Sequence, residues 1–191
     1  MEQPDWDTAT WQLLADLRVD QILALSQVQR RYVPGADEAV VSRWLTRLAG
    51  RRAVSVRTVW VPRTARARLA EEIVTVELPG RSGRQEEIAH RLGLAEMRWC
   101  LRAGLRHWQA IGQLWPEKRS YGERPDALAE DGAGLFVVEY DHGAYGASDV
   151  RRKHRAFAEL APRQVWGVSS ESRLRWLRMH LHSSEILVAV S

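Results

Sequence analysis

The chain has 191 residues, of which 45% are hydrophobic and nine are tryptophan, so it contains enough apolar surface to fold and is not a disordered polypeptide. Its single cysteine, Cys100, excludes an internal disulfide and a cysteine metal cluster, and we expect this residue to pack in a core. The first residues lack the regions of a secretory signal, and the longest apolar run, ILVAV, is far shorter than the roughly 20 residues of a membrane span. We therefore expect a cytoplasmic protein without membrane contact.

Positive charge is concentrated in one segment of the chain. The formal net charge is only +4, but residues 39–70 contain eight arginines and no acidic residue, whereas residues 1–40 contain seven acids and three bases. A local surplus of this kind favours an anionic partner at one surface.

Three helices are predicted in the N-terminal part, over residues 8–18, 20–32 and about 38–49. Asp20 and Asp37 are expected to cap the second and the third helix, because an aspartate side chain can accept backbone N–H groups at a helix start. Trp11 and Leu14 begin the apolar side of the first helix. The third helix has the i, i+3, i+4, i+7 spacing of a buried stripe, formed by Val41, Trp44, Leu45 and Leu48.

Two β-branched runs, 54–61 and 71–78, predict a hairpin whose tip, PRTARARLA, is basic. Three helices followed by a hairpin is the order of a winged helix-turn-helix, so residues 1–80 are predicted to be a domain that binds double-stranded DNA. Ser42, Arg43, Thr46 and Arg47 are expected to face the groove, with Arg43 and Arg47 on bases or phosphates; a solvated arginine face and a protein-binding winged helix remain alternatives. The arginines expected mainly to neutralise phosphates are Arg51, Arg52, Arg63, Arg66 and Arg68.

Residues 81–112 are predicted to be connecting helices, broken or bent near Gly93. Their apolar stripes fit packing against either half of the chain or against a second subunit, so a homodimer stays open.

Residues 113–191 alternate strand and helix signals, which is typical of an α/β layer structure. The run 134–140 predicts a central strand, and because side chains alternate along a strand, Glu139 and Asp141 should share one side. Asp126 lies shortly before this predicted strand in the sequence and is expected to approach Glu139 across a turn. Lys153, one of only two lysines, falls on the apolar side of a helix predicted over 149–160 and should point inward.

Three segments in this order, RPDAL (124–128), VVEYDHGAY (137–145) and RRKHRAF (151–157), resemble the PD-(D/E)xK nuclease core. Together with the winged helix, the whole chain resembles the replication-relaxation family of plasmid and mobile-element proteins. The resemblance implies an α+β protein, a winged helix-turn-helix followed by an α/β nuclease-like domain, with Asp126 and Glu139 as the acids that hold Mg²⁺. The position that the catalytic lysine usually occupies in the strand is taken by Asp141, so Lys153 would correspond to a lysine moved onto the following helix. The catalytic group implied by the resemblance is Asp126, Glu139, Asp141 and Lys153.

Three functions remain open from the sequence. The first is a DNA-binding protein of replication or relaxation that keeps the nuclease-like domain as a scaffold, with its acids and Lys153 forming a buried ion-pair network. The second is a Mg²⁺-dependent DNA nuclease or nickase, and the third is a winged-helix transcriptional regulator.

Overall fold

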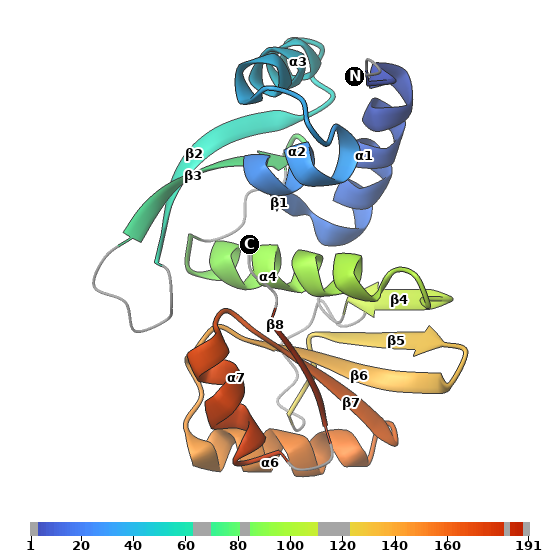
Figure 1. Cartoon of the computed structure of the whole chain (residues 1–191), viewed down its shortest axis with the longest axis vertical. Coiled ribbons are helices and arrows are strands. Elements are labelled where there is room, and N and C mark those ends of the chain that lie inside the picture. The colour runs from blue at the N-terminus through green and yellow to red at the C-terminus, as the bar shows by residue number, and fades with distance from the viewer. Residues whose placement is uncertain (1–3, 63–69, 81–84, 111–122, 182–183, 189–191) are drawn as a thin grey trace. The chain divides into compact units, whose positions relative to one another are not determined.

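A computed structural model describes residues 4–62, 70–80, 85–110, 123–181 and 184–188. Over these residues the protein is α+β, as expected, with six helices, a three-stranded sheet and a mixed five-stranded sheet (Figure 1). The chain divides into two compact units, and the boundary lies between Ala95 and Glu96, within α4 (Gln85–Leu101). None of the helices in the described ranges is long and apolar enough to cross a membrane.

The first unit contains three helices and a small antiparallel sheet whose strands lie in the order β1-β3-β2. The helices are α1 (Trp6–Asp20), α2 (Leu25–Tyr32) and α3 (Glu38–Gly50), and the strands are β1 (Ile22–Ala24), β2 (Ser55–Pro62) and β3 (Ala70–Glu77). The predicted hairpin is confirmed in β2 and β3, which pair along their full length.

The third helix forms as its sequence predicts. The Asp37 side chain accepts the backbone N–H of Ala39 at 2.8 Å, and this bond satisfies one of the N–H groups that a helix start leaves open. The predicted stripe is buried in one core with residues of α1 and α2; its members are Val41, Trp44, Leu45 and Leu48.

The start of the second helix was predicted wrongly. Residues 22–24 form β1, which pairs with β3, and α2 begins only at Leu25 without a cap from Asp20. The partner strand lies about fifty residues further along the chain, so the local spacing cannot reveal it. Trp11, expected on the apolar side of the first helix, is 72% exposed.

The connecting segment, expected to be broken or bent near Gly93, is not broken there. α4 continues through Gly93, which is buried, so packing offsets the roughly 1 kcal/mol that glycine costs in a helix. In the first unit, Ile88 and Leu92 of α4 pack with Ile22 and Val59 of the sheet. Residues 107–110, expected to be helical, form the strand β4 (His107–Ala110), and Cys100 is exposed instead of buried.

The second unit is built on the five-stranded sheet, in the order β4-β5-β6-β7-β8. β4, β5 and β6 form an antiparallel meander, whereas β6, β7 and β8 are parallel and are joined by α6 and α7. The predicted strand and helix of this part are confirmed as β6 (Gly134–Asp141) and α6 (Ala147–Ala158). The other elements are β5 (Ala127–Asp131), β7 (Arg163–Val168), α7 (Glu171–Arg178) and β8 (Glu185–Val188).

Different helices pack against the two faces of this sheet. On one face, Val137 and Trp166 pack with Val150 and Phe157 of α6 and with two leucines of α7, Leu174 and Leu177. On the other face Met97 approaches β7 so closely that a β-carbon at Gly167 would lie 2.3 Å from its Sδ. Because Glu139 is paired in register with Trp166, its side chain belongs to the face that α6 and α7 cover.

Candidate functional site

The side of α3 opposite its buried stripe is a candidate nucleic-acid interface. Arg43, Thr46 and Arg47 are exposed, as the sequence predicts, whereas Ser42 is only half-exposed; Ala39 is exposed as well. Arg51 and Arg52, directly after the helix, are exposed as well. Within the described ranges, none of these four arginines has a carboxylate partner, so their charges are available to a ligand.

The arginine-rich segment is free of acids in sequence but not in space. Arg57 of β2 forms an ion pair with Glu77 of β3, with Nε 2.5 Å from Oε1, because the two strands are paired. Three further carboxylates, Glu38, Glu71 and Glu72, line a hollow of about 290 Å³ beside β1 and α2. Among the described residues, the arginines without a carboxylate partner in this segment therefore lie between Arg43 and Arg52, and the arginine of β2 is not one of them. Three arginines predicted to contact phosphates, Arg63, Arg66 and Arg68, lie outside the described residues.

A second candidate site lies at the end of β6, where the strand presents Glu139 to α6. The Glu139 side chain is 1% exposed, and its Oε1 is 2.8 Å from the Lys153 Nζ and accepts the Tyr145 hydroxyl at 2.8 Å. The other oxygen, Oε2, is buried and has no hydrogen-bond partner among the residues that the structure describes. The expectation that Lys153 points inward toward an acid is confirmed.

Two further carboxylates stand beside this pair. Asp126 precedes β5, and its Oδ2 accepts the backbone N–H of Tyr140 at 2.7 Å, which fixes it next to the strand position of Glu139. Glu123 lies 3.7 Å from the Lys153 Nζ through Oε2, and it accepts the Arg152 Nε–H at 2.5 Å through Oε1. Lys153 is thus the cation shared by a small acidic cluster.

Asp141 follows on the same side of the strand but has other partners. Arg173 of α7 donates from Nε to its Oδ2 at 2.8 Å and from Nη2 to the same oxygen, while Gly143 N–H donates to Oδ1 at 2.8 Å. The Arg173 Nη2 also donates to the Tyr145 carbonyl oxygen at 2.7 Å. Arg173 therefore ties the loop after β6 to α7 and supports Tyr145 where its hydroxyl reaches Glu139.

Burial governs the protonation of the cluster. The pKa of Glu139 is raised to about 8, first by burial and then by the neighbouring charge of Asp126, and Lys153 and Tyr145 offset only part of this rise. Burial alone would lower the pKa of Lys153, but Glu139, Asp126 and Glu123 outweigh it, so this pKa is raised and the amine stays cationic. The pKa of Tyr145 is raised by burial and by Glu139, so its hydroxyl keeps its proton and acts as a donor.

The donor set fits a hard cation such as Mg²⁺. Asp126 and Glu139 are the two carboxylates that would hold it, and the described ranges contain no group of three or more His, Cys, Asp or Glu side chains that could hold a metal ion. Mg²⁺ commonly uses one or two carboxylates and takes its remaining ligands from water and substrate phosphates. The buried Glu139 Oε2 has no hydrogen-bond partner among the described residues, so it is the oxygen of this carboxyl that is left for a cation.

The chain matches no protein-family model, no curated protein and no solved structure. Sequence reasoning missed Glu123, Tyr145 and Arg173: Tyr145 lies inside the VVEYDHGAY segment, whereas nothing in the sequence singles out Arg173 among the arginines of its helix.

Proposed function

We propose that the first unit binds double-stranded DNA through the exposed side of α3. The observation that carries this proposal is a group of four exposed arginines without a carboxylate partner among the described residues: Arg43 and Arg47 on the side of α3 opposite its buried stripe, and Arg51 and Arg52 directly after the helix. The order α1-β1-α2-α3-β2-β3, with a sheet ordered β1-β3-β2, agrees with a winged helix-turn-helix, in which the third helix enters the major groove.

The chemistry of this surface suits a duplex. Arginine presents a planar set of donors that matches phosphate oxygens and the O6 and N7 acceptors of guanine. Ala39 and Ser42 are small, so the backbone of α3 can approach base edges closely. The resemblance to replication-relaxation proteins would place the binding event in the replication or relaxation of plasmid or mobile-element DNA.

The test is fluorescence anisotropy of the full chain with a labelled duplex over a salt series. R43A/R47A should weaken binding and lower the slope of log K against log salt by about one for each phosphate that is no longer neutralised. R18A, which removes an exposed arginine from α1, serves as the matched control and should bind like the wild type. Equal affinity of R43A/R47A and the wild type would remove α3 from the interface.

A second candidate function, metal-dependent DNA cleavage in the second unit, is favoured by the buried Oε2 of Glu139, which has no hydrogen-bond partner in the part of the chain that the structure describes. Asp126 and Glu139 would hold Mg²⁺, which when bound supplies an activated water and neutralises phosphate charge. Lys153, which stays cationic, would stabilise the charge that develops on a phosphate oxygen, and Tyr145 would keep Glu139 oriented. The sheet order and the helix that carries the lysine agree with the resemblance to a PD-(D/E)xK core.

Cleavage is tested by incubating supercoiled plasmid with the full chain and Mg²⁺ or Mn²⁺. The cleavage proposal expects nicking by the wild type, loss of nicking in E139Q, and unchanged nicking in E130Q, which neutralises an exposed glutamate of β5. Calorimetric titration with Mg²⁺ should show binding that E139Q weakens. Neither nicking nor metal binding by the wild type would reduce the cluster to a structural network and leave the DNA-binding proposal standing.

A further inference from the structure

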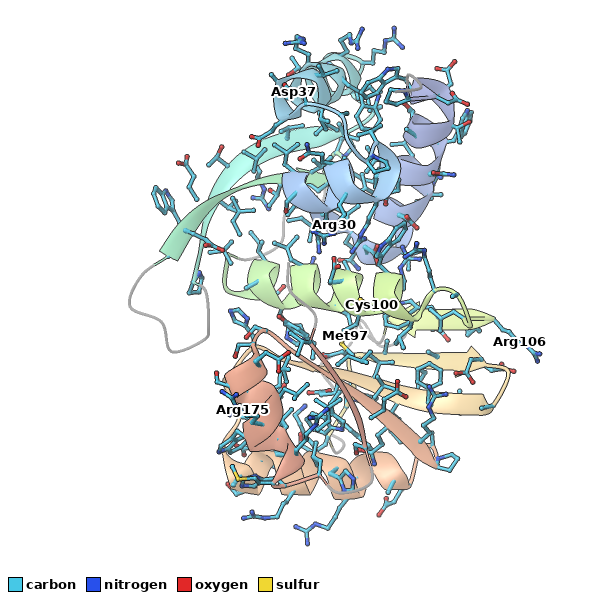
Figure 2. All side chains as sticks on the ribbon, in the orientation of Figure 1. Arg30, Asp37, Met97, Cys100, Arg106 and Arg175 are labelled. Carbon is cyan, nitrogen blue, oxygen red and sulfur yellow. The ribbon has the colours of Figure 1, made fainter. Side chains whose placement is uncertain are left out.

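The two helices that cover one face of the five-stranded sheet carry basic residues of two kinds. Lys153 of α6 and Arg173 of α7 point toward the sheet, where each binds a buried carboxylate. Arg151 and Arg155 of α6 and two arginines of α7, Arg175 and Arg178, are exposed instead. Figure 2 labels Arg175, whose side chain extends away from α7.

The exposed arginines stand on one side of the second unit. Val150 and Phe157 of α6 share a core cluster with Leu174 and Leu177 of α7, so both helices lie on the same face of the sheet and turn their opposite sides to solvent. Arg151 and Arg155 are four residues apart and Arg175 and Arg178 are three apart, spacings that put side chains on one helix face about 5–6 Å apart. Each helix therefore displays a pair of neighbouring guanidinium groups.

The pairing of charges distinguishes these four arginines from others in the unit. Arg152 is paired with Glu123 and Asp149, and Arg163 is paired with Asp131 and Glu185. In the part of the chain that the structure describes, Arg151, Arg155, Arg175 and Arg178 have no carboxylate partner. The exposed acids on the same two helical segments are Glu159 and Glu171, so the face keeps a positive surplus.

We propose that this face, formed by Arg151, Arg155, Arg175 and Arg178, is a second nucleic-acid contact that binds backbone phosphates. The inference rests on the proposed DNA-binding function and adds a surface in the second unit to it. Guanidinium groups match phosphate oxygens in geometry as well as in charge, and each strand of a duplex carries one phosphate per ~3.4 Å of helix axis, so each arginine pair can meet neighbouring phosphates. The contact reads the backbone only and carries no base specificity.

The experiment compares four forms of the full chain: the wild type, R43A/R47A, R151A/R155A/R175A/R178A and the combined variant. Anisotropy with two duplexes of unrelated sequence is measured over a salt series, after circular dichroism has shown that each form is folded. The second-unit variant should lower the salt slope by about one for each phosphate that its arginines no longer neutralise, up to about four, and weaken both duplexes equally. The lysine version of the same four positions should keep most of the slope, and R102A/R106A, which changes two other exposed arginines of this unit, should keep all of it.

Different results refute the second-unit contact and the α3 surface. If the second-unit variant binds with the wild-type slope while R43A/R47A is weakened, the second contact is refuted and the α3 surface stands. If R43A/R47A binds like the wild type while the second-unit variant is weakened, the α3 surface is refuted and the helical face of the second unit is the DNA contact. Binding of polyglutamate but of neither duplex would assign the face to an acidic protein and overturn the inference.

Discussion

The charged residues of α3 and those at the end of β6 differ in the surroundings that the fold gives them. Arg43 and Arg47 are exposed and have no partner among the described residues, whereas Glu139 is 0% exposed and shares Lys153 with other carboxylates. Removing an exposed, unpaired charge changes little in the folded state. Removing one member of a buried set leaves the others without compensation. Loss of function in an α3 variant therefore points directly to binding, whereas in a β6 variant it must first be separated from loss of stability.

The largest expected effect is that of Lys153→Ala. It leaves Glu139 and Asp126 buried or half-buried without their shared cation, which should lower the free energy of unfolding by about 3–5 kcal/mol, as for other broken buried ion pairs. Urea denaturation at a pH above about 8, where Glu139 is ionised, measures the loss. The double variant K153M/E139Q, which removes charge from both sides, should recover a large part of it. A loss below about 1 kcal/mol would show that water solvates Lys153 and Glu139. The charges at the end of β6 would then be as easy to remove as the exposed charges of α3.

The next effect concerns the packing that holds β7 against the second unit's core. Gly167→Ala places a β-carbon 2.3 Å from the buried Met97 Sδ, so the side chain must move, and we expect a loss of about 1–3 kcal/mol in urea denaturation. The double-mutant cycle with Met97→Ala should show coupling, because the alanine removes the atoms that clash. Strict additivity of the two changes would contradict the close approach.

The pH dependence of stability should also distinguish the buried carboxyl at the end of β6 from the exposed arginines of α3. The pKa of Glu139 is raised in the folded protein, so its contribution is complete below the ordinary glutamate value and is lost as the pH rises toward about 8. The free energy of unfolding of E139Q relative to the wild type should therefore increase between pH 5 and pH 8 in metal-free buffer. A difference that stays constant over this range would show that Glu139 is ionised throughout.

The smallest effect on stability is expected for the exposed arginines of α3. R43A/R47A should change the free energy of unfolding by less than about 0.5 kcal/mol, because both side chains are exposed and unpaired within the described ranges. Urea denaturation checks this value beside the DNA affinity of the same variant. A substantial destabilisation would mean that the arginines support the fold, and their removal could then no longer be interpreted as an effect on DNA binding alone.

The same two regions show which features of the fold can be predicted from the sequence. The i, i+3, i+4, i+7 spacing of α3 and the alternation along β6 are local, and they correctly place Arg43 outward and Glu139 and Lys153 inward. The inward direction of Lys153 follows from its position relative to Val150 and Phe157 on one helix. Composition and periodicity thus predict which side of an element a residue occupies.

Partners across the fold could not be predicted in this way. β1 depends on pairing with β3, Arg57 is neutralised by Glu77 of the neighbouring strand, and Arg173 reaches Asp141 from 32 residues away. Each contact is set by strand order and helix placement, which no local pattern encodes. The acid-free stretch in the sequence overstated the positive surface for the same reason.

The central claim is that duplex DNA lies against the exposed side of α3, and site-specific photo-crosslinking tests it most directly. A benzophenone amino acid replaces Thr46, which is exposed on that side, or Trp11, which is 72% exposed on α1 of the same unit. The account predicts a crosslink to labelled duplex from position 46 and none above background from position 11. Crosslinking from position 11 with none from position 46 would contradict it.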